Sequence, residues 1–100
     1  MPAVSRLGDK STGHGGFPPT AMITTPIAKT YFDGKYPGVV SPNCKFAAHT
    51  RGNTTHNSDI RYPSSGASKT NIEGFKAARI GDNLSDGDAI AQGSPKSFIE

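Results

Sequence analysis

The stretch Lys69-Thr70-Asn71-Ile72-Glu73 carries a pattern that two other segments of the chain repeat. The pattern is a lysine, a hydroxyl residue, a variable residue, a large apolar residue and an acid. It recurs as Lys29-Thr30-Tyr31-Phe32-Asp33 and as Lys96-Ser97-Phe98-Ile99-Glu100. Gly34 and Gly74 follow the acid in the first two copies, as expected for a short strand that runs into a turn.

The residues that follow each turn also resemble one another. Arg79-Ile80-Gly81-Asp82 matches Arg6-Leu7-Gly8-Asp9, and Tyr36-Pro37-Gly38-Val39-Val40-Ser41-Pro42 occupies the corresponding middle position. We therefore predict one small β-hairpin used about three times, with the shared apolar residue of each copy in the core. The Gly-Asp pairs are expected to form turns in which the aspartate bonds nearby backbone. Glycine or proline interrupts almost every window of helix length, so the sequence predicts an all-β fold with little or no helix.

The composition predicts a thin core. Only 33% of the 100 residues are apolar, and there is no tryptophan. A chain of this length is expected to form one domain, residues 1–100. Small chains with thin cores usually need a disulfide, a metal or a partner, and a single cysteine cannot form an internal disulfide. We therefore expect a metal, a partner or both.

Charge and targeting signals narrow the function further. The formal net charge is +3, but the basic residues are spread singly among acidic ones, which predicts a solvated surface rather than a nucleic-acid site. No apolar stretch near the N-terminus is long enough for the hydrophobic region of a signal peptide, and no run approaches a membrane span. We expect a soluble protein made in the cytoplasm.

The candidate metal ligands are the three histidines and the single cysteine, which are His14, Cys44, His49 and His56. Structural zinc takes four thiolate or imidazole ligands in a tetrahedron, so this set would fill one site without a leftover ligand. All four residues lie outside the repeated segments. The alternative is three exposed histidines and a buried thiol. We predict one structural zinc ion because the thin core needs added stabilisation. Zinc-finger peptides gain about 10–16 kcal/mol of folding free energy from binding zinc.

Taken together, these segments resemble the PAAR-repeat proteins, the small conical tips that cap the central spike of contractile injection machines. The resemblance covers residues 5–100. It rests on Arg6-Leu7-Gly8-Asp9 followed by Thr12-Gly13-His14-Gly15-Gly16-Phe17-Pro18-Pro19, on Asn71-Ile72-Glu73-Gly74-Phe75-Lys76-Ala77-Ala78-Arg79-Ile80-Gly81-Asp82, and on the closing Gly93-Ser94-Pro95-Lys96-Ser97-Phe98-Ile99. The combination is specific, although no single piece would be.

The resemblance implies a zinc ion near a pointed apex, held by the three histidines and the cysteine named above. It also implies a broad base that docks on a trimeric β-helical spike. The chain departs from the family at Lys76-Ala77-Ala78-Arg79, which has lysine where proline is usual. It departs again at Asp86, where many members have a further cysteine. We interpret that position as lying outside the zinc set.

The repeats predict that one monomeric copy caps one trimer, because three similar hairpins can present three edges to the three exposed strand edges of a trimeric β-helix. The zinc loops are expected at the opposite, exposed end, which contacts the target cell envelope only transiently. The predicted docking surface lies on the repeat strands, at Thr30, Tyr31, Phe32 and Asp33, at Thr70, Asn71, Ile72 and Glu73, and at Ser97, Phe98 and Ile99.

The function implied by the resemblance is a structural, non-enzymatic tip that pierces membranes. Many relatives carry fused toxin domains, and we expect none in this chain. The run His14-Gly15-Gly16-Phe17-Pro18-Pro19 is more similar to the phage versions, so we expect a phage tail baseplate, with assembly in the host cytoplasm and a final place in the virion. The alternative is a type VI secretion spike tip, exported from the bacterial cytoplasm without a signal peptide.

Two other classes of function are alternatives to this one. A zinc hydrolase would use three protein ligands and a water, whereas four ligands are available and no H-E-x-x-H motif is present. A Cys44 nucleophile paired with His49 or His56 would need oxyanion donors that the sequence does not indicate. A zinc-bearing nucleic-acid adaptor would bind with a steep dependence on salt. The residues leave zinc and iron open as the ion bound in vivo.

Overall fold

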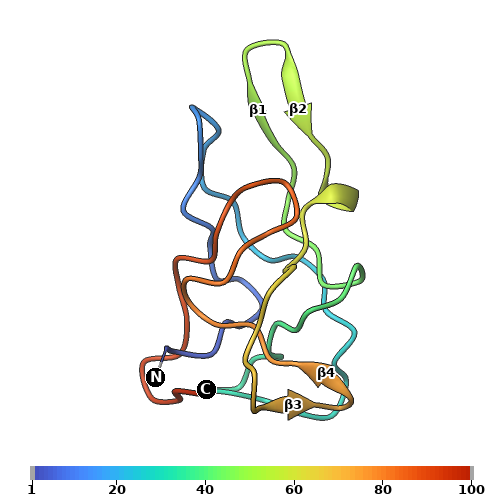
Figure 1. Cartoon of the computed structure of the whole chain (residues 1–100), viewed down its shortest axis with the longest axis vertical. Helices are drawn as coiled ribbons and strands as arrows, with labels where there is room; N and C mark the ends of the chain where they lie inside the picture. Colours follow the sequence, from blue (N-terminus) through green and yellow to red (C-terminus); the bar gives the residue numbers. More distant parts are fainter. Residues whose placement is uncertain (1, 100) are drawn as a thin grey trace.

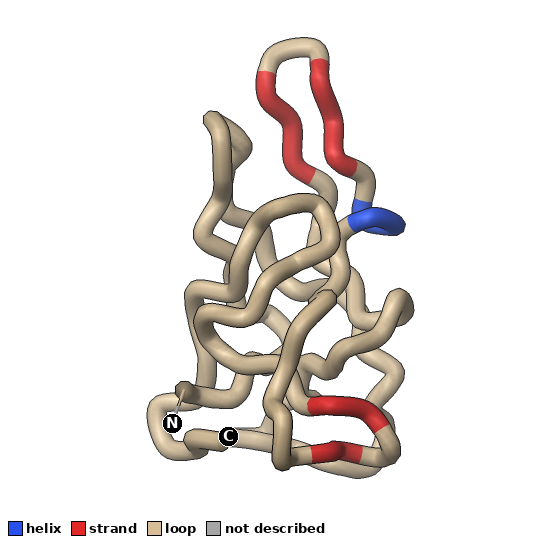
Figure 2. The backbone as a smooth tube through the Cα atoms, in the orientation of Figure 1, coloured by secondary structure: helices blue, strands red, loops and turns tan. Residues whose placement is uncertain are grey.

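Short strands and one turn of 3-10 helix are the regular elements of this chain (Figure 1, Figure 2). The computed structural model describes residues 2–99. The elements are β1 (His49–Arg51), β2 (Thr54–His56), η1 (Ser58–Ile60), β3 (Asn71–Ile72) and β4 (Phe75–Lys76). The predicted all-β fold with little helix is confirmed. The described part of the chain contains no helix that could cross a membrane.

The first two copies of the repeat form hairpins with the same kind of turn. In the second copy β3 pairs antiparallel with β4, and in the first copy Phe32 bridges Lys35. The two central residues of each turn have positive φ, at 56° for Asp33, 78° for Gly34, 51° for Glu73 and 89° for Gly74. Positive φ at both positions is the mark of a type I′ turn, whose twist suits a tight hairpin. The acid-glycine pairs of the sequence pattern therefore form the hairpin turns.

The third copy of the hairpin is completed by the two ends of the chain. Ala3 bridges Phe98 in antiparallel orientation, and the Ile99 amide donates a hydrogen bond of 2.9 Å to the Pro2 carbonyl. One strand of this hairpin therefore comes from each end of the sequence. Glu100, the acid of the third copy, lies outside the described residues.

A closed ring of backbone hydrogen bonds joins the second strands of the three hairpins. The Ser5 amide donates to the Ala78 carbonyl at 2.9 Å, the Ala78 amide to the Gly38 carbonyl at 3.0 Å, and the Gly38 amide to the Ser5 carbonyl at 2.8 Å. Each strand thus donates to one neighbour and accepts from the other. The three hairpins surround a pseudo-threefold axis.

The acids of the repeat connect one copy to another. The Asp33 carboxylate, in the first copy, accepts a hydrogen bond from the Ser94 hydroxyl, just before the third copy. The Glu73 carboxylate, in the second copy, accepts a hydrogen bond of 2.9 Å from the Thr30 hydroxyl, in the first copy. These acids therefore stabilise the arrangement of the hairpins.

The two Gly-Asp segments form matching turns. The Asp9 Oδ2 atom accepts hydrogen bonds from the Arg6 amide and the Arg6 Nε atom, both at 2.9 Å. The Asp82 Oδ2 atom accepts from the Arg79 amide at 2.7 Å and the Arg79 Nε atom at 3.1 Å. The glycine before each aspartate has a φ of 92° or 91°. The predicted role of both aspartates, binding nearby backbone in a turn, is confirmed.

The hydrophobic core lies between the hairpins and the loops above them. The buried residues of this cluster are Met22, Ile27, Val39, Cys44, Phe46, Ala67, Ile72, Ala77, Ala78, Leu84 and Ile90. Phe32 and Ile99, the equivalents of Ile72 in the other two copies, are partly buried and pack against it. The shared apolar position of the repeat therefore belongs to the core, as predicted.

The molecule is elongated, with extents of 38 × 23 × 22 Å, and its two ends differ. The three hairpins lie together at one end, which we call the base (Figure 1). The β1–β2 hairpin projects from the other end (Figure 1). We call the region formed by β1, β2 and the loops at residues 13–18 and 85–88 the apex.

Candidate metal centre

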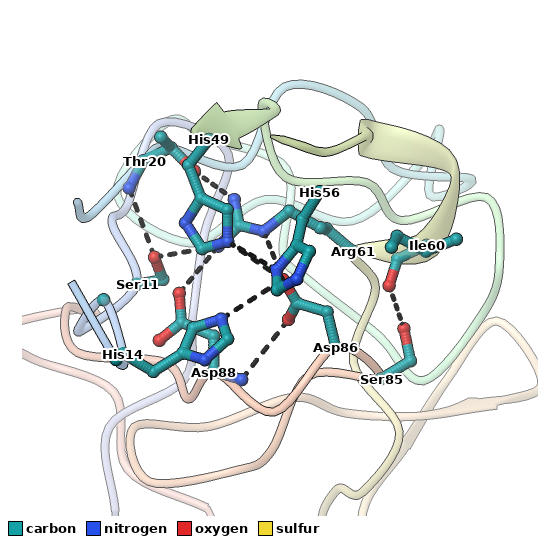
Figure 3. Close-up of polar contacts among 12 residues, drawn as sticks. Ser11, His14, Thr20, His49, His56, Ile60, Arg61, Ser85, Asp86 and Asp88 are labelled. Carbon is teal, nitrogen blue, oxygen red and sulfur yellow. Dashed lines mark hydrogen bonds and ion pairs between the residues drawn. The ribbon is translucent and has the colours of Figure 1, made fainter. Parts of the chain in front are cut away.

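Four side chains of the apex point toward one another and form a candidate metal site (Figure 3). They are His14, His49, His56 and Asp86. The His49 Nε2 and His56 Nδ1 atoms lie 3.1 Å apart, and each lies 3.1 Å from the Asp86 Oδ2 atom. The His14 Nε2 atom lies 3.6 Å from the same oxygen. The cluster could hold a metal ion.

The spacing of these atoms fits four-coordinate geometry. In a tetrahedron with metal–nitrogen and metal–oxygen bonds of about 2.0–2.1 Å, neighbouring ligand atoms lie about 3.3 Å apart. The separations given above, 3.1 and 3.6 Å, fall on either side of that value, and all four ligand atoms lie within 4.8 Å of one another. Three imidazoles and one carboxylate can therefore surround one transition-metal ion without large movement.

The β1–β2 hairpin brings two of the ligands together. His49 begins β1 and His56 ends β2, and the two residues face each other directly in the antiparallel register. Directly opposed residues project to the same face of a hairpin, so both imidazoles point to one side. The loop between the strands has Gly52 as its first residue, with a φ of 58°, as a two-residue hairpin loop of type II′ requires.

A second, smaller turn presents the third histidine. His14 and Phe17 form an antiparallel bridge, and their backbones exchange hydrogen bonds of 3.1 and 2.7 Å. Gly15 and Gly16, between them, have φ values of 51° and 89°. Two successive positive φ values suit glycine, so the run His14-Gly15-Gly16-Phe17 folds back tightly. The turn directs the imidazole toward the β1–β2 hairpin.

The protonation of the histidines suits metal binding. The His49 Nδ1 atom lies 2.9 Å from the Pro18 carbonyl oxygen, which can only accept a hydrogen bond, so the proton is on Nδ1 and the Nε2 lone pair faces the cluster. The His14 Nε2 atom is buried and has no hydrogen-bond partner within residues 2–99. A buried nitrogen without a partner is unfavourable, and a metal ion would satisfy it.

An aromatic ring covers the histidine ligands. Phe17 is 7% exposed, and its ring centroid lies 4.0 Å from that of His56, 4.6 Å from that of His49 and 5.1 Å from that of His14. The Arg51 guanidinium lies over the Phe17 ring, 5.1 Å from its centroid. This packing limits rotation of the imidazoles, although the His14 and His56 side chains remain 25% and 21% exposed.

Asp86 replaces Cys44 in the predicted ligand set. The structure does not bring Cys44 together with the three histidines, and the prediction of a thiolate ligand is corrected on this point. The Cys44 side chain is fully buried in the hydrophobic core, where its sulfur lies 3.6 Å from the Met22 sulfur. Burial raises the pKa of the Cys44 thiol to about 11, so the thiolate that a metal requires is disfavoured there.

The sequence places Asp86 outside the zinc set, whereas the structure brings its carboxylate against the three histidines. Its side chain is only 1% exposed. Burial favours the neutral acid, but hydrogen bonds from Arg61 and the Asp88 amide, and the charge of Arg61, lower the pKa of Asp86 below its usual value. The group is therefore an anion near neutral pH. One signal was present in the sequence, since aspartate and cysteine are both metal ligands.

The residues predicted to contact a partner lie at the base, in the three hairpins. Tyr31 and Phe98 occupy the variable position of their copies and are 56% and 51% exposed. Ile72 is 6% exposed, and the acids Asp33 and Glu73 bond to neighbouring copies. The structure therefore separates the predicted surface into outward and inward positions.

A scan against protein-family models and a search of curated proteins found no match to this chain.

Proposed function

We propose that this chain is a metal-stapled tip that caps one trimeric β-helical spike of a contractile injection machine. The observation that carries the proposal is the closed ring of backbone hydrogen bonds through Ser5, Gly38 and Ala78 at the base. A single chain with three similar hairpins around this ring can offer similar contacts to each subunit of a symmetric trimer. The exposed strand edges at the end of such a trimer need a partner of this shape.

The variable position of each repeat is the proposed centre of the docking surface. Tyr31, Asn71 and Phe98 are all exposed, whereas the apolar residue that follows each of them is buried or partly buried. Exposed aromatic side chains are frequent anchors in protein interfaces. We propose that these three side chains surround the axis and pack against the spike, while backbone edges beside them pair with its strands.

Native mass spectrometry of the chain mixed with a trimeric β-helical spike from its gene neighbourhood tests the stoichiometry. One chain per three spike subunits supports the proposal. Three chains per trimer, or no complex, would overturn it.

Variants then locate the docking surface. Replacing both exposed aromatics, Tyr31→Asp with Phe98→Asp, is expected to weaken the complex strongly, because charges would be buried in the interface. Ile60→Asp is the matched control, since Ile60 is 49% exposed and lies in η1, outside the base. Equal loss of the complex in both proteins would show that the base is not the docking surface.

We propose that the metal is one structural zinc ion. Imidazole ligands suit zinc and iron, and four protein ligands in a tetrahedron are the usual environment of structural zinc. His14, His49, His56 and Asp86 would hold the ion and connect three loops of the apex. Elemental analysis of purified protein should find one zinc per chain. Well-folded protein that carries no metal and takes up none would overturn this part of the proposal.

A catalytic zinc site would keep one position open for water. The support for a structural role is that Asp86 supplies a fourth ligand atom and that residues 2–99 form no pocket for a substrate. Cobalt-substituted protein offers a direct test, because the visible bands of a site closed by four protein ligands should not change when anions are added. A water on the cobalt that exchanges with added anions would favour the hydrolase alternative.

We propose that the tip belongs to a phage tail baseplate, because its His14-Gly15-Gly16-Phe17-Pro18-Pro19 run resembles the phage versions of PAAR-repeat proteins. In this role the stiff, metal-bound apex would meet the target envelope first, and the base would stay on the spike. Detection of the chain in purified virions by mass spectrometry would support the assignment. Its release from bacteria only when a type VI machine is intact would favour the secretion alternative.

A further inference from the structure

Arg61 is the largest fully buried side chain of the described residues. A guanidinium remains charged at every accessible pH, so its burial requires paired anions and filled hydrogen bonds. Its Nε atom donates to the Asp86 Oδ2 atom at 2.9 Å, and its Nη2 atom donates to the Asp88 Oδ2 atom at 2.6 Å. One of these two carboxylates is the proposed metal ligand.

The remaining donors of Arg61 reach the segments that carry the histidines (Figure 3). Its Nη2 atom donates to the Ser11 hydroxyl at 3.2 Å, and Ser11 lies three residues before the first histidine ligand. Its Nη1 atom donates to the Thr20 hydroxyl and to the Ala47 carbonyl. Ala47 lies two residues before His49, the second histidine ligand. Arg61 itself follows the third histidine by five residues. One side chain therefore connects all the ligand-bearing segments.

Arg61 also determines which lone pair of Asp86 is free. Each carboxylate oxygen can accept two hydrogen bonds or ligand bonds. Arg61 occupies one direction of Oδ2, the oxygen that faces the histidines, and the Asp88 amide lies 3.3 Å from Oδ1. Oδ2 can then bind a metal while Oδ1 is turned away from it. Asp86 is thus held as a one-oxygen ligand.

We infer that Arg61 is a positioning residue that builds the metal site before the ion binds and keeps it four-coordinate. The inference rests on the metal binding proposed above. Without the ion, the Arg61 contacts hold the four ligand segments near their final places. With the ion bound, they prevent Asp86 from turning to bind through both oxygens.

Arg61→Lys tests the positioning role, because lysine retains the charge but lacks the planar fork that joins two carboxylates. Loss of such supporting contacts typically weakens metal affinity about 10–100-fold, and we expect a loss in this range for zinc. The visible bands of the cobalt form should weaken as the coordination number rises. Arg6→Lys is the matched control: it removes a similar arginine–aspartate pair at the base, and its zinc affinity and cobalt spectrum should match those of the wild type.

Calorimetry of zinc binding to the metal-free wild-type protein tests preorganisation without any variant. A site that is already formed buries little new surface, so the heat-capacity change of binding should be small. A large negative value would show that the apex folds only around the ion and would overturn the inference. This measurement decides the matter even if Arg61→Lys does not fold.

The outcomes distinguish failure of the Arg61 inference from failure of the metal-binding proposal on which it rests. If neither calorimetry nor cobalt spectroscopy detects metal binding by the wild-type protein, the metal-centre proposal fails. If it binds zinc while Arg61→Lys has the same affinity and the same cobalt spectrum, only the positioning role of Arg61 is overturned. Weaker binding with an altered spectrum in Arg61→Lys, and not in Arg6→Lys, supports it.

Discussion

The base is held by backbone contacts that repeat in each hairpin, whereas the apex is held by side chains from segments far apart in the sequence. At the base, three similar turns and one ring of backbone hydrogen bonds surround the hydrophobic core. At the apex, the side chains of His14, His49, His56 and Asp86 come from three separate segments and meet around one site. We therefore expect the base to be the more stable end, while the apex depends on Arg61 and on the proposed metal.

The largest expected effect is the loss of the metal. His49→Ala should abolish zinc binding and lower the midpoint of thermal unfolding by roughly 15–30 °C, because a loss of several kcal/mol shifts a domain of this size by about 4–8 °C per kcal/mol. Hydrogen exchange should rise in β1 and β2, because these strands open more often without the ion although Arg61 still holds them in place, and it should remain slow in β3 and β4. Differential scanning calorimetry and hydrogen exchange with mass spectrometry measure the two effects.

Removal of zinc by a chelator from the wild-type protein is the control for this variant. It should produce the same pattern of exchange, and the pattern should reverse when zinc is restored. If exchange rises equally in β3–β4, the base is not independent of the apex, and the comparison between them fails.

A smaller effect is expected from crowding the base. A Cβ atom added at Gly66 would lie 2.6 Å from the Ala77 carbonyl oxygen and 2.6 Å from the Val40 side chain. The contact is with backbone that cannot move easily, so Gly66→Ala should cost about 1–3 kcal/mol of unfolding free energy. Chemical denaturation measures this cost, and zinc affinity should be unchanged. Weaker zinc binding would contradict the separation of the two ends.

Gly8→Ala is the matched control for this prediction. A Cβ atom at Gly8 meets nothing within 4 Å, but the residue has a φ of 92°. Only backbone strain is then added, at a cost of about 1 kcal/mol. A larger loss for Gly8→Ala than for Gly66→Ala would show that steric contact around the ring is not what limits the base.

The base was readable from sequence because its interactions are local or repeated. Positive φ is needed where Asp33-Gly34 and Glu73-Gly74 turn, and the apolar residue before each pair recurs with the turn, so the pattern predicts hairpins. The pairing of residues 2–4 with 97–99 was less accessible, because it joins the ends of the chain. Nothing local in either segment specifies the other.

The metal site was only partly readable, for a related reason. The histidines stood out because few residue types bind zinc, and His49 and His56 are the ends of one hairpin. The choice between Cys44 and Asp86 depends on tertiary packing. Cys44 faces the core beside Met22, and Asp86 is carried to the histidines by a loop that Arg61 holds. No spacing rule encodes such a contact.

A third prediction tests whether Asp86, and not Cys44, is the fourth ligand. Cys44→Ala should keep one zinc per chain and lose only about 1 kcal/mol of stability, as expected for a small cavity in a core. Asp86→Ala should lose the zinc. Elemental analysis after dialysis decides between them. The opposite result, with zinc lost in Cys44→Ala and kept in Asp86→Ala, would restore the thiolate site.

The smallest expected effect concerns the acid that connects two copies of the repeat at the base. The hydrogen bond from Ser94 lowers the pKa of Asp33, burial opposes this shift, and Arg6, with its Nη1 atom 3.0 Å away, lowers the pKa further. A carboxyl group whose pKa is lower in the folded state than in the unfolded state stabilises the fold above the unfolded pKa, and this contribution disappears as the pH falls through the folded value. The unfolding free energies of the wild type and Asp33→Asn should therefore differ by a constant amount between about pH 5 and 7. The difference should then shrink below the ordinary aspartate pKa of 3.8.

Metal loss in acid affects both proteins alike and cancels in the comparison. Asp59→Asn, which removes an exposed partner of Lys45 outside the base, should show a smaller difference. If the difference in unfolding free energy between the wild type and Asp33→Asn does not change with pH, the negative charge of Asp33 does not help to connect the copies.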